Sequence, residues 1–324
     1  MAEITSVVDQ IPPGPSWTNR DSTSAVGTRR GVSIYARNYQ SFDLPRLMGI
    51  DAHQHFWIYK PGEYEWIDES MAAIRRDFLP EDLKPELEGN EFQGSVAVQA
   101  RQTLEETRWL LELADRSSKI LGVVGWVDLR SPDALSQLSG FARNPKLVGL
   151  RHIVQSEPDD RFLLRPDFLR GIALLEEFDL GYDILIYTKH LPVAAEFVER
   201  FPRQRFVLDH LAKPPIKSRE IESWAAGIRR LAAFPNVFCK LSGLVTEADW
   251  QRWTPEDITP YLDIAFEAFG ASRLMIGSDW PVCLVAGSYS RTLDIVKNYL
   301  RNHTAETREA VLGGNARRFW RLKA

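Results

Sequence analysis

Two histidines separated by one residue, His53 and His55, form the most distinctive chemical motif of this sequence. They follow a short apolar run that starts at Gly49, so we expect them at the end of a β-strand. Side chains alternate between the two faces of a strand, so both imidazoles point to the same side, about 6 to 7 Å apart. Such a pair can bind one metal ion or one anionic oxygen. Histidines that only hydrogen-bond to loop carbonyls would leave the same pattern, and the motif alone leaves both readings open.

Other candidate groups lie at the ends of later apolar runs. His152, His190 and His210 each follow such a run, and Asp279 ends the last one. Among the six histidines, His303 is the exception. If the runs are the strands of a parallel barrel, these imidazoles and the carboxylate line its mouth, which is an arrangement suited to activating water.

Asp279 is the carboxylate that we choose as the general base. It ends the last run, and the last strand of a closed barrel neighbours the first, which places Asp279 beside His53 and His55. Its alternative role is to cap a following helix, since Pro281 comes soon after it. The position at the end of the last strand favours the catalytic role.

Two other aspartates are expected to serve the structure. Asp209 directly precedes His210, so strand alternation makes it face away from the barrel axis. Asp51 lies two residues before His53 and faces the same way but deeper, where we expect a buried hydrogen-bonding role. Neither aspartate is therefore expected in the catalytic centre.

Eight short apolar, β-branched runs recur after residue 48, at 49–52, 95–98, 121–127, 147–150, 183–186, 205–208, 237–241 and 273–276. Runs of this kind suit strands that are buried on both faces, as in parallel sheets. The stretches between them carry helical signals. Apolar stripes cover 168–178 and 191–201, and capping hydroxyls precede a proline at Ser131 and Thr254. Strands that alternate with helices in this way predict an α/β fold, a (β/α)8 TIM barrel.

The predicted barrel is a single domain, residues 46–324, that follows an N-terminal extension, residues 1–45. The extension is rich in turn-forming residues and has little periodicity, so we expect it to be partly irregular. A doubly wound sheet is the competing fold. It would need a glycine-rich dinucleotide loop after the first run, and the sequence has none there.

Composition and charge exclude several classes of protein. The 324 residues are 44% hydrophobic, which excludes disorder as the main state. The net charge is -4 with no basic stripe, which argues against nucleic acid or a membrane surface as partner. No apolar run approaches the roughly 20 residues of a membrane span. The two cysteines, Cys239 and Cys283, form no CxxC pair, and this usage predicts a reducing, cytoplasmic location.

Together these motifs resemble the lactonase branch of the amidohydrolase superfamily, which holds L-fuconolactone and L-rhamnonolactone hydrolases and the pyrone dicarboxylate lactonase. The resemblance covers about residues 49–322 and leaves the N-terminal extension outside. A single HxH motif is weak evidence, whereas the ordered series is specific. The segments that carry the resemblance are 51–57 (DAHQHFW), 98–100 (VQA), 105–107 (EET), 149–152 (GLRH), 189–192 (KHLP), 209–214 (DHLAKP), 277–281 (GSDWP) and 314–316 (GNA).

The resemblance implies hydrolysis of a lactone ring, in which an aspartate activates water. The catalytic centre that it implies consists of His53, His55, His210 and Asp279. Lysines at the ends of the sixth and seventh strands would polarise the carbonyl or bind substrate oxygens, as suits a point-charge donor to a developing oxyanion. The residues expected to contact substrate are Arg151, His152, Lys213, Lys240, His190, Tyr187, Trp280 and Gln99.

One departure from the family pattern concerns the metal. Metal-dependent members usually place a histidine, or a bridging carboxylated lysine, at the end of the fourth or fifth strand. Here the position has Tyr187, with His190 three residues later. His53, His55 and Asp279 could still hold one divalent cation, zinc being the first choice. The branch also includes metal-free members, in which imidazoles and lysines supply the electrostatics and the aspartate takes the proton. The metal-bound version is slightly favoured.

The expected substrate is a neutral sugar lactone. Dicarboxylate lactonases of the branch surround their substrate with arginines, whereas this chain has Lys213 and Lys240 at the corresponding places. Trp57, Trp126 and Trp280 lie near strand ends, where they either stack on a sugar ring or pack between strands and helices. A decarboxylase or amide hydrolase on the same scaffold, and a non-catalytic sugar-binding barrel, are the alternatives. The chain is also a candidate for a homo-oligomer.

Overall fold

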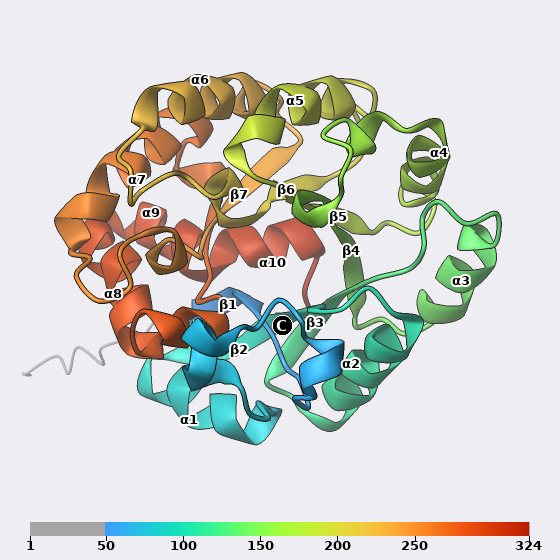
Figure 1. The fold of residues 1–324 in the computed structure, drawn as a ribbon, viewed down its shortest axis with the longest axis horizontal. Coiled ribbons are helices and arrows are strands. Elements are labelled where there is room, and N and C mark those ends of the chain that lie inside the picture. Colours follow the sequence, from blue (N-terminus) through green and yellow to red (C-terminus); the bar gives the residue numbers. More distant parts are fainter. Residues whose placement is uncertain (1–48, 324) are drawn as a thin grey trace, which may run out of the picture. The chain divides into compact units, whose positions relative to one another are not determined.

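Eight parallel strands form one sheet in which each strand pairs with the next along the chain (Figure 1). The structure is a computed structural model that describes residues 49–323, so the predicted extension 1–45 lies outside the described residues. Each of the eight predicted runs is a strand. The strands are β1 (Gly49–Gln54), β2 (Phe92–Val98), β3 (Ile120–Gly125), β4 (Leu147–Ile153), β5 (Gly181–Leu185), β6 (Phe206–Leu208), β7 (Val237–Leu241) and β8 (Leu274–Ile276).

The sheet closes into a barrel where the ends of β1 and β8 meet. The backbone N–H of Asp279 donates to the carbonyl of His53 at 2.8 Å, and the N–H of His55 donates to the carbonyl of Trp280 at 2.6 Å. Below this contact, the carboxylate of Asp51 accepts hydrogen bonds from the backbone and hydroxyl of Ser278 at 2.9 and 2.6 Å. The predicted buried hydrogen-bonding role of Asp51 is therefore confirmed, and the (β/α)8 barrel with it.

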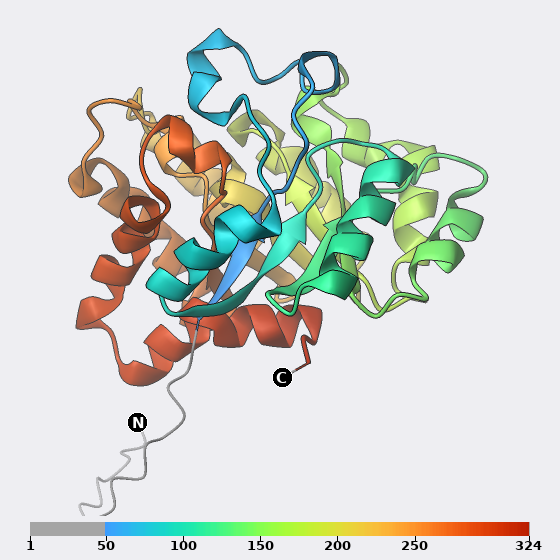
Figure 2. The ribbon, with the colours of Figure 1, turned by 90° about the horizontal axis from the view of Figure 1, so that it is seen from below.

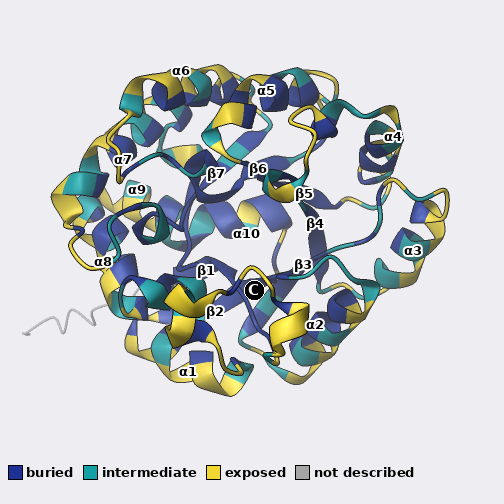
Figure 3. Cartoon of the chain, in the orientation of Figure 1, coloured by how far each residue is buried: buried dark blue, intermediate teal, exposed yellow. Residues whose placement is uncertain are grey.

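Helices between the strands form the outer ring, with their buried faces toward the sheet (Figure 3). None of the helices in residues 49–323 is long and apolar enough to cross a membrane. The eight helices of the ring are α1 (Pro80–Gly89), α2 (Leu104–Arg116), α3 (Ala134–Phe141), α4 (Pro166–Leu174), α5 (Leu191–Glu199), α6 (Ile221–Ala232), α7 (Pro255–Phe269) and α8 (Tyr289–Tyr299).

The helical signals in the sequence are confirmed with adjusted ends. Thr254 is the N-cap residue of α7, and its N–H donates to the Asp257 carboxylate at 3.0 Å, as in a capping box. Ser131 differs, because its hydroxyl accepts from the N–H of Asp133 in a turn and α3 starts only at Ala134. The stripe over 168–178 also runs past its helix, since α4 ends at Leu174 and a turn follows.

The C-terminal helices close one end of the barrel and leave the other end for the site. α9 (Ala305–Glu309) leads to α10 (Asn315–Trp320), which lies across the end of the barrel where the strands begin (Figure 2). Phe319 and Trp320 pack there with strand residues such as Val96 and Met275. The strands end at the opposite side, where the long segment after β1 projects. Loops at this end can therefore line a pocket without disturbing the core.

Two glycines in the outer helices test how tightly these helices pack against their neighbours. A Cβ on Gly171 of α4 would lie 2.0 Å from the carbonyl oxygen of Leu129, whereas a Cβ on Gly140 of α3 would meet nothing within 4 Å. We expect Gly171→Ala to lower the free energy of unfolding by roughly 1–3 kcal/mol, because the backbone must shift. Gly140→Ala is the matched control and should raise it by about 0.5–1 kcal/mol. Urea denaturation measures both, and an unchanged midpoint for Gly171→Ala would contradict this packing.

Candidate active site

The contact between β1 and β8 brings the proposed base to the histidine pair. Nε2 of His53 lies 3.2 Å from Nε2 of His55. The Asp279 carboxylate oxygen lies 3.3 Å from Nε2 of His55 and 3.8 Å from Nε2 of His53. The sequence-predicted convergence of these three side chains is therefore present in the structure.

A hydrogen bond to the backbone orients the imidazole of His55. Its Nδ1 lies 2.7 Å from the carbonyl oxygen of Val98, at the end of β2. A carbonyl only accepts, so Nδ1 donates this hydrogen bond and Nε2 faces Asp279 and His53. The ring is thus held with Nε2 directed at these two groups, which is the orientation that a shared metal ion requires.

His210 joins this group from a left-handed turn after β6. Four consecutive residues, 210–213, have φ between 50° and 57°, a conformation that costs non-glycine residues roughly 1–2 kcal/mol each. The indole N–H of Trp224 donates to the Leu211 carbonyl at 2.7 Å, and the Thr188 hydroxyl lies 3.2 Å from the Lys213 carbonyl. The turn places Nε2 of His210 3.8 Å from the Asp279 carboxylate.

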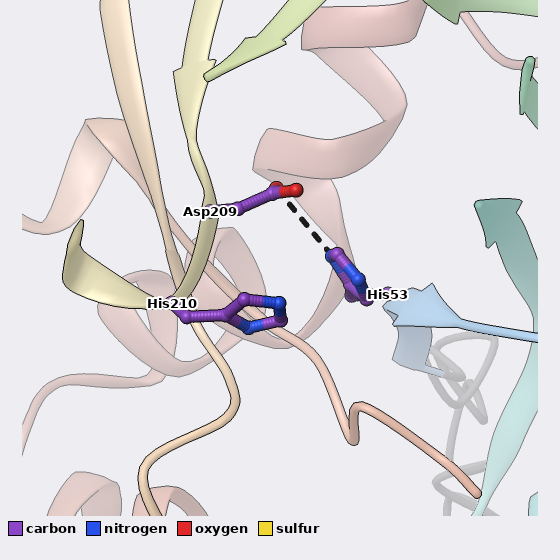
Figure 4. A group of neighbouring side chains, drawn as sticks. All are labelled: His53, Asp209 and His210. Carbon is purple, nitrogen blue, oxygen red and sulfur yellow. Dashed lines mark ion pairs between the residues drawn. The ribbon is translucent and has the colours of Figure 1, made fainter. Parts of the chain in front are cut away.

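The prediction that Asp209 faces away from the barrel axis is wrong. Its carboxylate lies inside the barrel, 3.4 Å from Nδ1 of His53, and Figure 4 shows it on the same side of the chain as His210. Strand alternation does not apply here because β6 ends at Leu208 and the left-handed turn begins at His210. Asp209 and His210 therefore approach His53 together.

A buried ion-pair cluster surrounds the inner side of His53. Lys240 pairs with Asp183 and, at 2.8 Å, with Asp209, while Arg151 pairs with Asp209 at 3.0 Å. Burial raises the pKa of Asp183 to about 7 although Lys240 opposes the rise. Burial would also raise the pKa of Asp209. Lys240, His53 and Arg151 outweigh this effect and hold that pKa well below its usual value. The cluster therefore keeps Asp209 ionised beneath the site.

The same surroundings decide the charges of the catalytic candidates. Burial, and then the Lys240 ammonium 3.1 Å from Nδ1, lower the pKa of His53 well below its usual value. Burial lowers the pKa of His210 to about 4. Burial alone would raise the pKa of Asp279, but the three imidazoles, led by His210, bring it below its ordinary value. At neutral pH the site thus contains an ionised carboxylate beside neutral His53 and His210, which is the protonation state that a base needs.

A pocket of about 360 Å³ opens onto these groups at the mouth of the barrel. This volume is in the range of small-molecule sites. Its walls come from the loops that follow the strands, and its lining residues are His55, Trp66, Met71, Ala100, Arg151, Ile153, Gln155, Ser156, Leu185, Tyr187, His210, Lys213, Thr246, Glu247, Trp250, Asp279 and Val282. Arg151, Tyr187 and Lys213, which we expect to contact substrate, thus lie on the pocket wall.

The other residues predicted to contact substrate lie behind the pocket wall. Lys240 is fully buried in the ion-pair cluster. His152 contacts Glu157 at 2.6 Å and stacks on Phe162, and Nε2 of His190 faces Asp160 at 3.2 Å. The remaining two are buried against neighbours: Trp280 against Phe56 and Phe78, and Gln99 against Arg151.

Several groups on the pocket wall are not among the residues expected from the sequence. Trp66 comes from the long segment after β1, Gln155 follows β4, and Glu247 and Trp250 follow β7. The loops after barrel strands usually form the active site, so the position of Glu247 and Trp250 after the seventh run could have indicated a role in the pocket. Motif spacing cannot find these residues, because they lie in irregular loops well beyond the strand ends.

One group of side chains fits a metal ion. The ligand atoms of His53, His55 and Asp279 lie 3.2 to 3.8 Å apart. Ligands at 2.0–2.1 Å around a tetrahedral zinc ion are about 3.3 Å apart, so these residues suit zinc with a fourth position open. A second group, His53, Asp209 and His210, is also close together, but Lys240 and Arg151 already pair with its carboxylate. The first group is therefore the better metal site.

Comparisons with known proteins agree with this geometry. The amidohydrolase family pattern matches residues 50–322. The chain is 43% identical over 284 residues to an L-fucono-1,5-lactonase of Burkholderia multivorans, covering 84% of this chain and 96% of that protein. A crystal structure of a Burkholderia multivorans amidohydrolase with bound Zn is 42% identical, with a TM-score of 0.83 and coverage of 85% of this chain and 100% of that one. An L-rhamnono-gamma-lactonase of Scheffersomyces stipitis is 24% identical over 166 residues, 44% of this chain and 48% of that protein.

Gly243 tests the placement of His210. Gly243 has φ +63°, and a Cβ there would lie 2.5 Å from Nδ1 of His210. We expect Gly243→Ala to displace the imidazole and to lower turnover by about 10-fold or more, because small displacements of reacting groups are costly. Gly270→Ala is the matched control, since Gly270 has φ +66° with nothing within 4 Å and shares only the backbone strain. Equal activity of the two variants in steady-state assays would contradict the proposed role of His210.

Proposed function

This chain is a member of the amidohydrolase family, and from its site we propose that it hydrolyses the ring ester of a neutral sugar lactone. The observation that carries the proposal is the carboxylate of Asp279, which lines a pocket of about 360 Å³ and lies within 3.3 to 3.8 Å of three imidazoles. The L-fucono-1,5-lactonases among its relatives support a sugar lactone as substrate.

Asp279 accepts a hydrogen bond from the attacking water and takes its proton. The water oxygen then forms a bond to the ring carbonyl carbon, and the carbonyl electron pair moves onto the oxygen. Arg151 lines the pocket, with Nη1 3.3 Å from Nε2 of His53. Its Nη atoms stay bonded to Asp209 and Gln99, and the positive charge of the guanidinium stabilises the nearby oxyanion through space.

Collapse of the tetrahedral intermediate breaks the bond between the carbonyl carbon and the ring oxygen. His210 is neutral and its Nε2 lies 3.8 Å from Asp279, so it can receive the proton and pass it to the departing ring oxygen. The products are one carboxylic acid and one alcohol on the opened chain, and Asp279 returns to its ionised state.

We assign His53, His55 and Asp279 as the residues that would hold a zinc ion. A bound zinc ion would polarise the carbonyl and lower the pKa of water. The tetrahedral spacing of the three ligand atoms supports this assignment, and so does the Zn-containing relative. In the metal-free alternative, the buried ion-pair cluster, Arg151 included, supplies the electrostatic stabilisation, and Asp279 takes the proton in the same way.

We also infer a cytoplasmic location and a small-molecule lactone as the partner of this site. Cys239 and Cys283 are both buried and free, which suits a reducing compartment. Assembly into a homo-oligomer stays a prediction, and analytical ultracentrifugation would test it.

Asp279→Asn tests the proposed base. The amide keeps the shape of the side chain but cannot take the proton, so we expect kcat on an aldonolactone to fall by about 10²–10⁴-fold with the fold retained. A pH-indicator assay measures the acid that ring opening releases. Asp133→Asn, an exposed aspartate before α3, is the control for loss of one negative charge. A variant at position 279 that keeps the native rate would remove this residue from the mechanism.

Metal content tests the zinc assignment independently of activity. Protein purified without chelators is expected to contain about one zinc per chain by elemental analysis, because one group of ligands fits it. His55→Gln should lower that content, since it removes one of the three ligands, and the exposed-site variant Asp133→Asn should keep it. Metal-free native protein with full turnover would instead support the alternative mechanism.

A further inference from the structure

Glu247 is a largely buried carboxylate on the pocket wall that the proposed hydrolysis does not use. It ends the short turn Val245–Glu247 after β7, and its side chain is 22% exposed. Lys213, from the left-handed turn after β6, places its Nζ 3.5 Å from the carboxylate. Both side chains line the same pocket as Asp279 and His210.

Charge balance in the pocket decides what this pair can bind. Arg151 is engaged by Asp209 at 3.0 Å and by Gln99, and Lys213 is paired with Glu247. The cations on the wall are therefore compensated by carboxylates, so a carboxylate on the substrate would meet no free arginine fork. The partly exposed carboxylate of Glu247 remains an acceptor for uncharged O–H groups.

Aromatic side chains complete this part of the wall. The Lys213 ammonium lies 5.5 Å from the centre of the Tyr187 ring, and Trp250 holds its place by donating its indole N–H to the Thr246 carbonyl at 2.9 Å. Tyr187 and Trp66 are 41% and 43% exposed at the mouth. Apolar ring faces beside a charged donor and acceptor match the C–H face and the hydroxyls of a sugar ring.

We propose that Glu247 and Lys213 recognise the ring hydroxyls of the lactone, with the Glu247 carboxylate accepting O–H hydrogen bonds and the Lys213 ammonium donating to hydroxyl oxygens. This assignment rests on the proposed function and explains how the site would select its substrate. The pair selects hydroxylated, neutral lactones over lactones that carry a carboxylate or no hydroxyl. Glu247 is then a specificity residue, whereas Asp279 performs the chemistry.

The test compares two lactones of the same ring size in Glu247→Gln. For a six-membered aldonolactone, kcat/KM should fall by about 10- to 100-fold, mainly through KM, because a hydrogen bond to a charged acceptor is lost. For the unsubstituted six-membered lactone, kcat/KM should stay within about twofold, which also shows that the variant is folded. Lys213→Met should produce the same selective loss.

Asp249→Asn is the matched control on the same loop. Asp249 lies two residues after Glu247, pairs with the exposed Arg252 at 2.8 Å and is absent from the pocket wall, so both lactones should react at native rates. Equal losses on the two lactones in Glu247→Gln, or no loss on either, would overturn the assignment of Glu247 alone. Failure of the native protein to open any lactone would overturn the proposed function and this inference together.

Discussion

The peptide hydrogen bonds that join β1 to β8 position the residues of the active site. Asp279 and the histidine pair lie more than two hundred residues apart in the chain, and the 2.8 Å contact between the Asp279 N–H and the His53 carbonyl brings them together. Asp51 secures this contact from below through Ser278, and burial raises the pKa of Asp51 to about 6 although its donors oppose the rise. Without this contact, Asp279 and the histidine pair would not meet.

Two features of the barrel interior lower the stability of the fold but position the active site. Lys240, Asp183, Asp209 and Arg151 are buried charges whose desolvation is costly, and such clusters are weak evidence for stability. The left-handed turn after β6 adds backbone strain. Both features serve the histidines, since the cluster surrounds the inner side of His53 and the turn directs His210 toward Asp279. The apolar core of the barrel and the packing of α10 must offset the free-energy cost of these two features.

The barrel fold could be predicted from the sequence because buried strands and helices leave apolar runs and apolar stripes. It also predicted the meeting of His53, His55 and Asp279, which follows from strand order in a closed barrel. The predicted direction of the Asp209 side chain was wrong because the alternation of side chains along a strand requires extended backbone. The chain leaves that conformation at His210. Lys240 was expected at the substrate, but its position within β7 directs it into the ion-pair cluster. Glu247 was missed because loop conformation depends on tertiary packing, which leaves no periodic pattern.

We propose that water, activated by Asp279, attacks the carbonyl carbon of a lactone. Ring opening in ¹⁸O-labelled water under single-turnover conditions tests it most directly, with mass spectrometry of the product. Attack at the carbonyl carbon predicts one ¹⁸O atom in the new carboxylate and none in the released hydroxyl. Label in the hydroxyl would mean attack at the alkyl carbon, and release of carbon dioxide would mean decarboxylation. Either result would overturn the proposed hydrolysis.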